Sequence, residues 1–384
     1  MSAPRTITFE LGERSYPIVI GRGLLGGDFD LGEYLAGGDC LVVSNETVAP
    51  LYLDTLKANL FGKTVATIQL PDGESFKTLD TLSTVLDKLV SSGANRDTTL
   101  VALGGGVVGD ITGFAAACYM RGVGFIQVPT TLLAQVDSSV GGKTGVNHPL
   151  GKNLVGAFHQ PRIVLIDTAT LDTLPDRELS AGLAEIIKAG AIADAGFFDW
   201  LEANMVALVA RDPEAVAHAV QRSCEIKAEV VAQDEREAGR RAILNFGHTF
   251  GHAIEHCLGY GEWLHGEAVA AGMVMAARLS GIDAADVERL EALLKVANLP
   301  VAPPAVGPQA MLDAMGMDKK VLNKKLRFVV LEQLGRAAVT SDYDRSQLDE
   351  VLGATNRRKT SLRTPRARRG AVADATRSLL RGIA

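Results

Sequence analysis

Residues 98–110 read TTLVALGGGVVGD and indicate the class of fold. An apolar run of strand length, residues 98–103, leads directly into a glycine-rich turn, and residues 111–120 then show a helical pattern. The turn matches G-x-G-x-x-G, whose bare glycines let a pyrophosphate approach backbone N–H groups at a helix N-terminus. Close packing of a helix on a strand also requires small residues, so the glycines alone leave that structural alternative open.

Further apolar runs on both sides of this segment extend the strand pattern, with connections of helix length between several of them. This alternation predicts an α/β fold. After about residue 171 most strand signals give way to Ala-rich segments with helical spacing. We therefore predict an α/β domain over residues 1–170, a mostly α-helical domain over 171–355 and a flexible basic tail over 356–384. The expected strands are residues 6–11 and 16–20 as a hairpin, 40–44, 64–70, 98–103, 124–128 and 163–167, then 326–331 and 337–339; the expected helices are residues 177–189, 196–209, 213–234, 248–257, 267–279 and 285–297.

The composition is that of a globular protein of about two domains. The chain has 384 residues, of which 47% are hydrophobic and 22% charged, and this excludes a wholly disordered chain. The net charge of −6 is unevenly spread, because residues 356–384 hold nine Lys or Arg and one acid, which leaves −14 on the first 355 residues. We expect a solvated tail, with contact to nucleic acid or another polyanion as the alternative.

The sequence predicts a cytoplasmic protein without a membrane span. Acidic residues and glycines interrupt the first 30 residues, so no secretory signal is indicated. The uncharged run at residues 268–277 falls well short of the ~18 residues that a span requires. Cys40, Cys118, Cys224 and Cys257 are scattered, and we expect buried thiols rather than disulfides or a thiolate metal site.

An acidic segment lies upstream of the glycine loop. The strand expected after the loop ends in Gln127-Val128-Pro129, without the acid that holds a ribose hydroxyl in the ordinary dinucleotide-binding pattern. Asp72 or Glu74, in PDGESFK at residues 71–77, could supply that contact. The alternative is turn and helix-start chemistry, which needs no ligand.

Residues 136–153 form a polar, glycine-rich stretch between apolar segments. A long loop without regular structure is more often functional than not, so we expect a functional loop. Lys143 and Lys152 would act there as point charges for a phosphorylated substrate or a cofactor. The GKT at residues 142–144 is similar to the end of a P-loop, but the upstream glycine of that pattern is missing, so ATP binding is not supported. Two exposed lysines on a flexible loop are the alternative.

Histidines cluster late in the chain. His248, His252 and His256 recur every four residues and share one helix face, while His265 begins the next helical segment. H-x-x-x-H on a helix can place two imidazoles on one metal. Thr249 stands where a zinc protease has Glu, so protease chemistry is not supported.

A carboxylate and a lysine lie three residues apart on the expected helix around residues 179–189. They are Glu185 and Lys188, and this spacing puts them on one face. One carboxylate and two imidazoles with an open position suit a catalytic zinc ion. A polar helix face with ordinary hydrogen-bonded histidines is the alternative.

Taken together, these motifs resemble the 3-dehydroquinate synthases of the sugar-phosphate cyclase superfamily over about residues 5–355. The resemblance implies an N-terminal NAD-binding α/β domain and a C-terminal, mostly α-helical metal-binding domain, with the active site between them, and a homodimer. Gly145 departs from the family pattern, where alanine is expected, and the basic tail has no counterpart there. The motifs are GGGVVGD at 104–110, YMRG at 119–122, VPTTLL at 128–133, VDSSVGGK at 136–143, LGKN at 150–153, GAF at 156–158, AEIIK at 184–188, NFGHTFGH at 245–252 and LHGE at 264–267.

The resemblance also implies roles for single residues. A divalent metal, zinc or cobalt, would be bound by Glu185, His248 and His265, which makes His252 an active-site neighbour and not a ligand. Arg121 would reach the site of the neighbouring subunit. The residues implied for NAD are Asn45, Asp72, Gly73, Glu74, Lys77, Gly106, Val107, Val108, Gly109, Asp110, Thr130, Thr131, Asp137, Lys143 and Lys152, and those implied for substrate and catalysis are Lys143, Asn153, Lys188, Lys227, Arg241, Asn245, His252 and one of Lys319 and Lys320.

The activity implied is the conversion of 3-deoxy-D-arabino-heptulosonate 7-phosphate into 3-dehydroquinate and phosphate, the second step of the shikimate pathway to aromatic amino acids. NAD⁺ would oxidise the C5 hydroxyl, phosphate would leave by β-elimination, and NADH would return the hydride before an aldol closure. No NADH would accumulate. The substrate has a phosphate and a carboxylate, which explains why an acidic protein would gather basic residues in one cleft.

Three other functions stay open. Other sugar-phosphate cyclases take a different ketose or heptulose phosphate, but Asn153, Asn245 and residues 248–250 match the dehydroquinate pattern. Metal-dependent polyol dehydrogenases of similar architecture would release NADH and need no set of phosphate-binding lysines. A non-catalytic protein that binds NAD and metal and uses its Arg-rich tail on nucleic acid is the third. Nucleic acid is not expected as a partner, and contact by the tail is the alternative.

Overall fold

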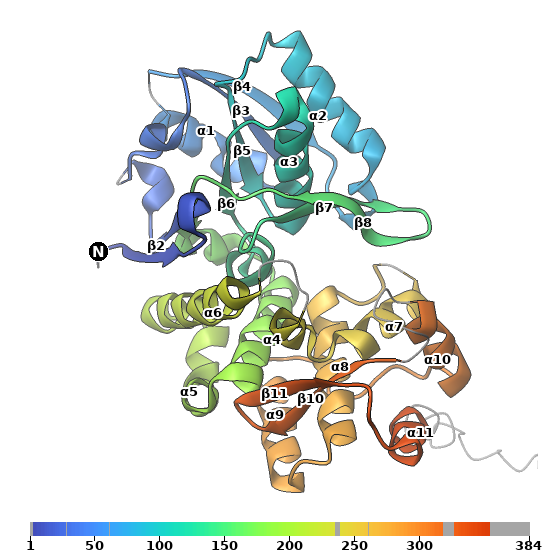
Figure 1. Ribbon diagram of the computed structural model, residues 1–384. Coiled ribbons are helices and arrows are strands. Elements are labelled where there is room, and N and C mark those ends of the chain that lie inside the picture. Colours follow the sequence, from blue (N-terminus) through green and yellow to red (C-terminus); the bar gives the residue numbers. More distant parts are fainter. Residues whose placement is uncertain are drawn as a thin grey trace, which may run out of the picture.

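Figure 1 shows the computed structural model, which describes residues 3–27, 29–60, 62–234, 239–259, 261–317 and 326–353. Lys319 and Lys320, and the basic tail expected over residues 356–384, lie outside the described residues.

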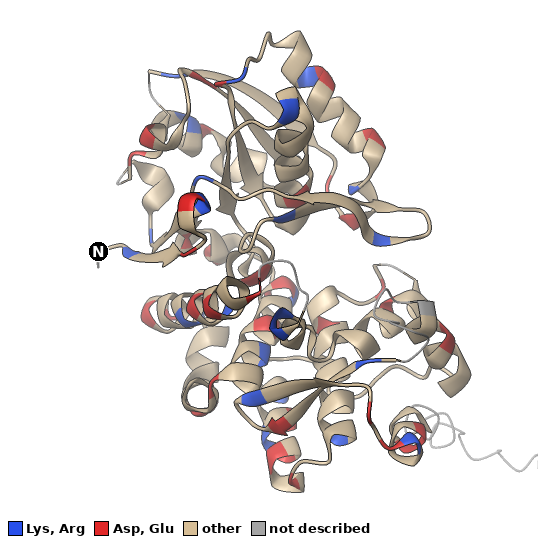
Figure 2. Ribbon diagram, in the orientation of Figure 1, with Lys and Arg blue, Asp and Glu red and all other residues tan. Residues whose placement is uncertain are grey.

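A seven-stranded sheet forms the first part of the chain, in the order β1-β2-β9-β6-β5-β3-β4. The expected hairpin of β1 and β2 is antiparallel, and the other neighbours are parallel. Every residue of β5 is buried and none is charged, as in a parallel sheet that is covered on both faces (Figure 2). The strands are β1 (Arg5–Phe9), β2 (Tyr16–Gly21), β3 (Asp39–Asn45), β4 (Thr64–Leu70), β5 (Thr99–Gly104), β6 (Phe125–Pro129) and β9 (Val164–Asp167).

Helices cover both faces of this sheet. α1 (Ala49–Asn59) packs over one face, where Val42 of β3 joins its core cluster. α2 (Leu79–Ser91) and α3 (Gly106–Cys118) cover the other face, where Val43 joins theirs. Successive side chains of a strand point to opposite faces, so one strand serves both cores. Because parallel strands end at the same edge, the segments after β3, β4, β5 and β6 gather there.

The second part of the chain is built around two buried helices, α4 (Asp176–Ala193) and α8 (His265–Ser280). They approach closely, because a Cβ at Gly266 would lie 2.1 Å from the backbone oxygen of Ala181 in α4. Only glycine fits such a contact. This packing brings the start of α8 against α4. The other elements are α5 (Ala195–Val209), α6 (Pro213–Gln233), α7 (His248–Leu258), α9 (Ala284–Val296), α10 (Pro308–Met317), α11 (Arg345–Gly353) and the hairpin of β10 (Phe328–Gln333) with β11 (Arg336–Thr340).

The two parts share a hydrophobic core. Ile18 of β2 and Val164 of β9 belong to the same buried cluster as Ile187 of α4 and Val220 of α6. Figure 1 shows α4 and α6 directly beneath this end of the sheet. The helical part is therefore joined to the sheet by apolar contacts and not only by a covalent connection.

The expectation of an irregular loop over residues 136–153 is wrong for most of it. β7 (Lys143–His148) and β8 (Gly151–Phe158) form an antiparallel hairpin, preceded by a short π-helical turn. The strands approach so closely that a Cβ at Gly156 would lie 2.0 Å from the backbone oxygen of Thr144. Glycines that permit this contact have low strand propensity, which is why the sequence pattern resembled a loop.

The cysteine expectation holds for two of the four residues. Cys40 and Cys224 are buried free thiols, whereas Cys257 is half-buried and Cys118 is exposed. Cys118 is the last residue of α3 and does not belong to the core cluster under that helix. Within the described ranges, none of the helices combines the length and apolar character of a membrane span.

Candidate functional site

Three possible metal ligands from three helices meet in one place. Glu185 lies in α4, and His248 and His265 are the first residues of α7 and α8. Their ligand atoms all lie within 4.8 Å of one another. Glu185 Oε1 is 3.7 Å from His248 Nε2 and 3.9 Å from His265 Nε2. These separations suit one ion with bonds of about 2 Å to each atom.

Both imidazole rings turn Nε2 toward Glu185. Nδ1 of His248 lies 3.2 Å from the backbone oxygen of Phe246, and Nδ1 of His265 lies 3.4 Å from Oε2 of Glu255. A proton on each Nδ1 would be donated to these oxygens and would leave the Nε2 lone pairs available. Metal-binding histidines in proteins are usually oriented in this way.

The two oxygens of Glu185 have different surroundings. The side chain is buried, and Oε2 forms an ion pair with Lys188, one turn along α4. Oε1 has no hydrogen-bond partner among the described residues. An unsatisfied buried carboxylate oxygen is unfavourable, and a divalent cation would satisfy it. The residues present therefore fit a metal ion.

Buried cations lie beside these three side chains. Lys227 donates to the backbone oxygen and to Oδ1 of Asp137, at 2.5 and 2.6 Å. Burial raises the pKa of the Asp137 carboxyl, but the charges of Lys227 and Lys188 outweigh this and hold that pKa well below its usual range. Arg241 is only 2% exposed, and its Nη2 donates to the backbone oxygen of Gly141 at 3.4 Å. Such a cluster suits an anionic ligand.

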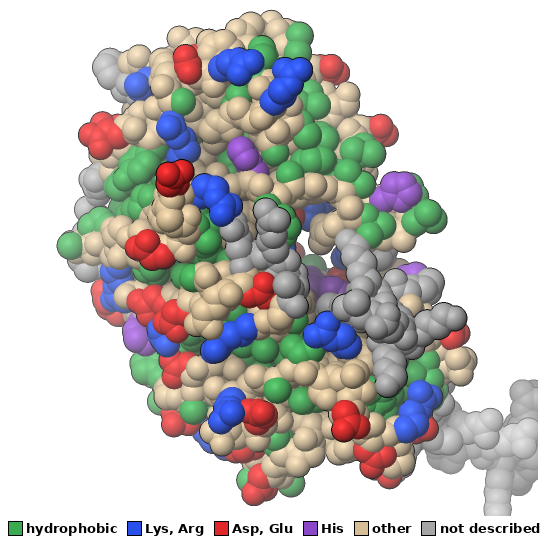
Figure 3. Space-filling view, viewed as in Figure 1, with side chains coloured by type: hydrophobic (Ala, Val, Ile, Leu, Met, Phe, Trp, Pro, Cys, Tyr) green, Lys and Arg blue, Asp and Glu red, His purple; other side chains and the backbone are tan. Residues whose placement is uncertain are grey.

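Of two further predicted residues, His252 has its ring near the ligand trio, and Asn245 precedes His248 by three residues in the chain. Asn245 ends the short 3-10 helix η8 (Arg240–Asn245), just before α7. The ring centroid of His252 lies 5.4 Å from that of His248 and 5.9 Å from that of His265. His252 is thus close enough to serve as an active-site neighbour of these rings. Figure 3 shows a hollow between the sheet and the helical part, in which histidine side chains are visible.

The predicted phosphate loop is a turn from β5 into α3. A Cβ at Gly104 would lie 2.8 Å from Val108 Cγ2, and one at Gly106 would lie 2.8 Å from Ser138 Oγ. The hydroxyl oxygens of Ser138 and Thr130 are buried without a hydrogen-bond partner in the described part of the chain. Val108 packs into the core, so it can offer a ligand only its backbone. Bare backbone and unsatisfied hydroxyls at a helix N-terminus fit a phosphate group.

The acidic segment lies at the same edge of the sheet. Asn45, the last residue of β3, donates to Asp72 Oδ1 at 2.6 Å, and Thr47 donates to Asp72 Oδ2 at 2.7 Å. Glu74 accepts a hydrogen bond from Asn147 of β7 at 2.8 Å. Carboxyl ends of parallel strands are where α/β sheets bind ligands.

Lys77 is buried between the sheet part and the β7–β8 hairpin. Its Nζ donates to Asp110 Oδ2 at 2.5 Å and to Asn153 Oδ1 at 2.7 Å. Lys77 therefore fixes a residue of α3 and a residue of β8 relative to each other. Lys143, at the start of β7, is exposed.

Glu255 was not predicted as a site residue from the sequence. This carboxylate in α7 is buried, accepts from Lys152 Nζ at 2.9 Å and faces His265. Burial raises its pKa, but its contacts with His265 and Lys152 lower it to about 2. The i,i+3 spacing of His252 and Glu255 was a signal that could have pointed to it, since such residues share a helix face.

Two family models match adjacent parts of the chain: 3-dehydroquinate synthase N-terminal over residues 67–181 and 3-dehydroquinate synthase C-terminal over residues 182–321. The chain belongs to the dehydroquinate synthase-like sugar-phosphate cyclases. It is thus an enzyme of that family, and its α/β part followed by a helical part is the expected fold.

Solved structures agree with this assignment. The 2-epi-5-epi-valiolone synthase ValA from Streptomyces hygroscopicus subsp. jinggangensis 5008, with NAD⁺ and Zn²⁺ bound, is 30% identical, with a TM-score of 0.82 over 93% of this chain and 99% of that one. A 2-deoxy-scyllo-inosose synthase complexed with carbaglucose-6-phosphate, NAD⁺ and Co²⁺ is 27% identical, with a TM-score of 0.81 over 91% and 99%. Glycerol dehydrogenase from Schizosaccharomyces pombe, 16% identical with a TM-score of 0.63 over 90% and 92%, shares the fold. The cofactors of the two cyclases match those expected from the sequence.

Arg121, another predicted site residue of this cyclase, lies away from the phosphate loop. It follows α3 at its C-terminal end, whereas the phosphate loop is at the N-terminal end. A helix of 13 residues puts about 20 Å between the two ends. Met120 and Arg121 have φ angles of 49° and 66°, which non-glycine residues rarely adopt. Arg121 therefore lies at the end of α3 that is away from the phosphate loop.

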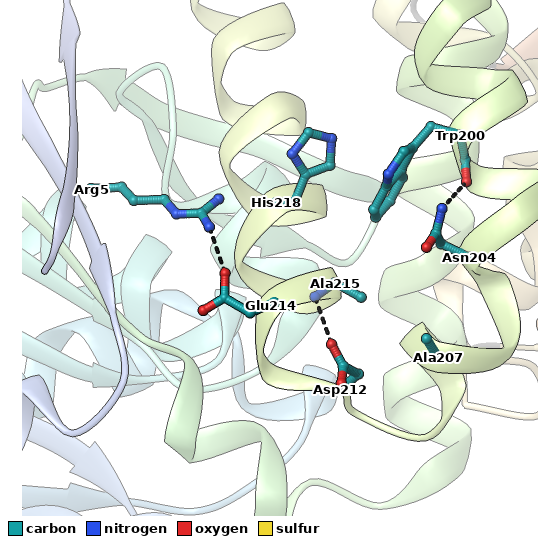
Figure 4. A pocket seen from close by; sticks show the side chains of 8 residues that line it. All are labelled: Arg5, Trp200, Asn204, Ala207, Asp212, Glu214, Ala215 and His218. Carbon is teal, nitrogen blue, oxygen red and sulfur yellow. Dashed lines mark hydrogen bonds and ion pairs between the residues drawn. The ribbon is translucent and has the colours of Figure 1, made fainter. Parts of the chain in front are cut away.

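A separate surface pocket of about 520 Å³ lies between β1, α5 and α6 (Figure 4). Its lining includes none of the predicted site residues. Arg5 pairs with Glu214 at 3.0 Å, Asp212 accepts from the backbone N–H of Ala215, and the His218 ring lies 4.3 Å from that of Trp200. These contacts within the lining give no indication of a ligand. The candidate site of the cyclase is therefore the one around Glu185.

Proposed function

We propose that this cyclase is a 3-dehydroquinate synthase, a carbon–oxygen lyase that converts 3-deoxy-D-arabino-heptulosonate 7-phosphate into 3-dehydroquinate and phosphate. The observation that carries the proposal is the set of three buried cations, Lys188, Lys227 and Arg241, beside the ligand trio. A substrate with a carboxylate and a phosphate uses such a set better than a sugar phosphate with one anionic group. Both matching family models are those of 3-dehydroquinate synthase, which supports the same choice.

In this proposal Glu185, His248 and His265 hold a divalent zinc or cobalt ion. When bound, the metal and NAD⁺ supply the reversible oxidation of an alcohol that makes elimination of phosphate feasible. His252 lies close enough to the trio to move a proton on the substrate, and Asn245 orients the substrate beside it. Buried Arg241 offers a planar fork for a carboxylate. Lys143, Asn153 and one of Lys319 and Lys320 complete the substrate contacts.

NAD⁺ would lie along the carboxyl edge of the sheet, with its pyrophosphate at the start of α3. The unsatisfied hydroxyls of Thr130 and Ser138 support this placement. Asp137, Lys143 and Lys152 would line the nicotinamide end. The other proposed contacts are Asn45, Asp72, Gly73, Glu74, Lys77, Gly106, Val107, Val108, Gly109, Asp110 and Thr131.

We further propose a cytoplasmic homodimer that serves the shikimate pathway, in which Arg121 of each subunit completes the partner's site. The two domains, over residues 1–170 and 171–355, would bind NAD and the metal with substrate, respectively. The rare backbone angles at Met120 and Arg121 support a functional role for this turn.

The testing experiment measures phosphate release from the heptulosonate phosphate with NAD⁺ present, with and without a chelator, while absorbance follows net NADH. We expect phosphate without NADH, loss of release on chelation, and a product with the mass of 3-dehydroquinate. Release of NADH without phosphate would instead indicate a polyol dehydrogenase.

The 30% identity to a 2-epi-5-epi-valiolone synthase supports one competing candidate, another cyclase of the same family. For this candidate we propose a heptulose phosphate without the carboxylate as substrate. The same assay with sedoheptulose 7-phosphate separates the two. Phosphate release from sedoheptulose 7-phosphate, but not from the heptulosonate phosphate, would reject the dehydroquinate synthase proposal. It would leave the assignment to the family unchanged.

A further inference from the structure

Glu255 links the metal-ligand trio to the β7–β8 hairpin. It lies in α7 with 5% of its surface exposed. Its two oxygens face different elements, since Oε1 accepts from Lys152 Nζ of β8 at 2.9 Å and Oε2 lies 3.4 Å from Nδ1 of His265 in α8. Glu255 thus contacts a residue of the hairpin and a residue of the trio at once.

Glu255 could itself be a ligand, because His252, Glu255 and His265 form a second group of close ligand atoms. The hydrogen bonds argue against that role. Both oxygens of Glu255 are engaged by protein groups, whereas Glu185 Oε1 has no hydrogen-bond partner among the described residues. His265 can turn only one nitrogen to an ion, and its Nε2 faces Glu185. Glu255 therefore accepts the proton-bearing side of the ring, opposite the ligand nitrogen.

The hairpin continues this chain of contacts toward the predicted nucleotide site. Asn153, next to Lys152 in β8, accepts from Lys77, and Lys77 also donates to Asp110 in the first turns of α3. On the other strand, Asn147 accepts from the backbone N–H of Asn153 and donates to Glu74. Neighbouring residues of one hairpin thus contact both the start of α3 and Glu255.

We propose that Glu255 is a positioning residue that holds His265 in its metal-binding orientation and makes metal and NAD⁺ binding interdependent through Lys152. The proposal rests on the proposed function, because it takes Glu185, His248 and His265 as the metal site and the α3 edge as the nucleotide site. A carboxylate that accepts from a ligand histidine strengthens the metal bond of that ring. Because linkage is reciprocal, NAD⁺ that tightens metal binding is itself bound more tightly by the metal-loaded protein.

The test measures Co²⁺ affinity of the full-length protein by competition with a chromophoric chelator, with and without NAD⁺, so it does not depend on turnover. Glu255→Gln keeps the size of the side chain but removes its charge and one acceptor. We expect its Co²⁺ affinity to fall about 10- to 100-fold, with a changed Co²⁺ absorption spectrum. The matched control is Glu291→Gln. It removes an equivalent charge from the ion pair between Glu291 of α9 and Arg278 of α8, and it should leave Co²⁺ affinity unchanged.

Lys152→Met provides a second variant that leaves Glu255 in place. Its side chain is 25% exposed, so the fold should tolerate the change. In the wild-type protein NAD⁺ should shift the Co²⁺ affinity, and this shift should disappear in both Lys152→Met and Glu255→Gln. A shift that persists in Lys152→Met would overturn the coupling, even if Glu255→Gln did not fold.

The outcomes also separate this proposal from the proposed function. A folded Glu255→Gln protein that binds Co²⁺ as tightly as Glu291→Gln would overturn the role of Glu255 alone. A wild-type protein that binds no Co²⁺ would overturn the metal site and this proposal with it. Loss of Co²⁺ affinity in Glu255→Gln, with wild-type phosphate release restored at saturating Co²⁺, would support a positioning role over a catalytic one.

Discussion

Glu185 and Lys188 form a buried ion pair one turn apart on α4, with 2% and 4% of their side-chain surfaces exposed. The pair uses one oxygen of Glu185 and directs the other toward His248 and His265. Buried lysines need a counter-charge to remain protonated. The Glu185 carboxylate therefore pairs with Lys188 through one oxygen and offers the other oxygen to the candidate metal.

Substitutions at this pair should separate metal binding from turnover. Glu185→Gln removes a charged ligand, so we expect Zn²⁺ binding to weaken by at least about 100-fold and phosphate release to be lost. Lys188→Met leaves the carboxylate to the metal, so Zn²⁺ should bind at least as tightly while phosphate release is lost. Metal content after dialysis and phosphate assays check both. Tight Zn²⁺ binding by Glu185→Gln would contradict this ligand assignment.

The Asp137–Lys227 pair predicts a pH effect. Burial lowers the pKa of Lys227, and Asp137 opposes that shift. In Asp137→Asn the pKa of Lys227 should fall further, so its ammonium, and the substrate affinity that depends on it, should be lost as pH rises through this lowered value. The measurement is kcat/KM for phosphate release between about pH 6 and 9, which reports groups of the free enzyme. A variant whose profile is parallel to that of the wild type would show that Asp137 does not hold the charge on Lys227.

The phosphate loop can be tested by adding one methyl group. Gly106→Ala puts a Cβ 2.8 Å from Ser138 Oγ, so NAD⁺ affinity should fall about tenfold or more while the helix itself accepts alanine well. Gly38→Ala is the control, because a Cβ there meets no atom within 4 Å. Titration calorimetry with NAD⁺ compares them. No difference between the two glycine variants would reject the loop as a nucleotide site.

Arg121 predicts complementation between inactive subunits. If it acts across a dimer, Arg121→Ala and Lys188→Met should each be inactive, yet mixed dimers should recover about a quarter of the sites. The measurement is phosphate release after the two variants are unfolded together and refolded. If Arg121 acts only within its own chain, the mixture stays inactive.

The close contact of α8 with α4 predicts a large effect on stability. Gly266→Ala would place a Cβ 2.1 Å from a backbone atom, so we expect a loss of about 3 kcal/mol or more in the free energy of unfolding. Gly316→Ala, in α10 with open space around the glycine, should instead stabilise the protein by about 0.5–1 kcal/mol. Urea denaturation gives both values. Equal stabilities would mean that α8 can move away from α4 without loss.

Local sequence patterns predicted most helices and strands well, because each of these elements has a characteristic spacing of apolar residues. β4 begins and ends where expected, and α6 differs only at its last residue. The β7–β8 hairpin was missed because its pairing depends on a close approach of glycines, which leaves little strand signal. The close approach of β7 and β8 depends on the tertiary structure, so a local sequence pattern does not indicate it.

In the candidate site, too, local spacing indicated some residues and tertiary packing determined the others. Glu185 and Lys188 share a helix face, which spacing alone indicates. Spacing also favoured His248 and His252 as joint ligands, whereas the trio pairs His248 with His265 from another helix. Only the packing of α8 against α4 brings His265 to Glu185, and family resemblance, not helical periodicity, identified it. Glu255 was missed because its partners come from β8 and α8.

The cluster that joins Ile18 and Val164 to Ile187 and Val220 sets a limit on how the chain can be divided. A fragment cut near residue 170 would expose the strand faces that α4 and α6 now cover, and fresh apolar surface of that kind promotes aggregation. Nucleotide-binding and metal-binding segments expressed separately should therefore be insoluble. The same continuity predicts a single cooperative thermal transition for the enzyme, with two functional regions but one unit of unfolding.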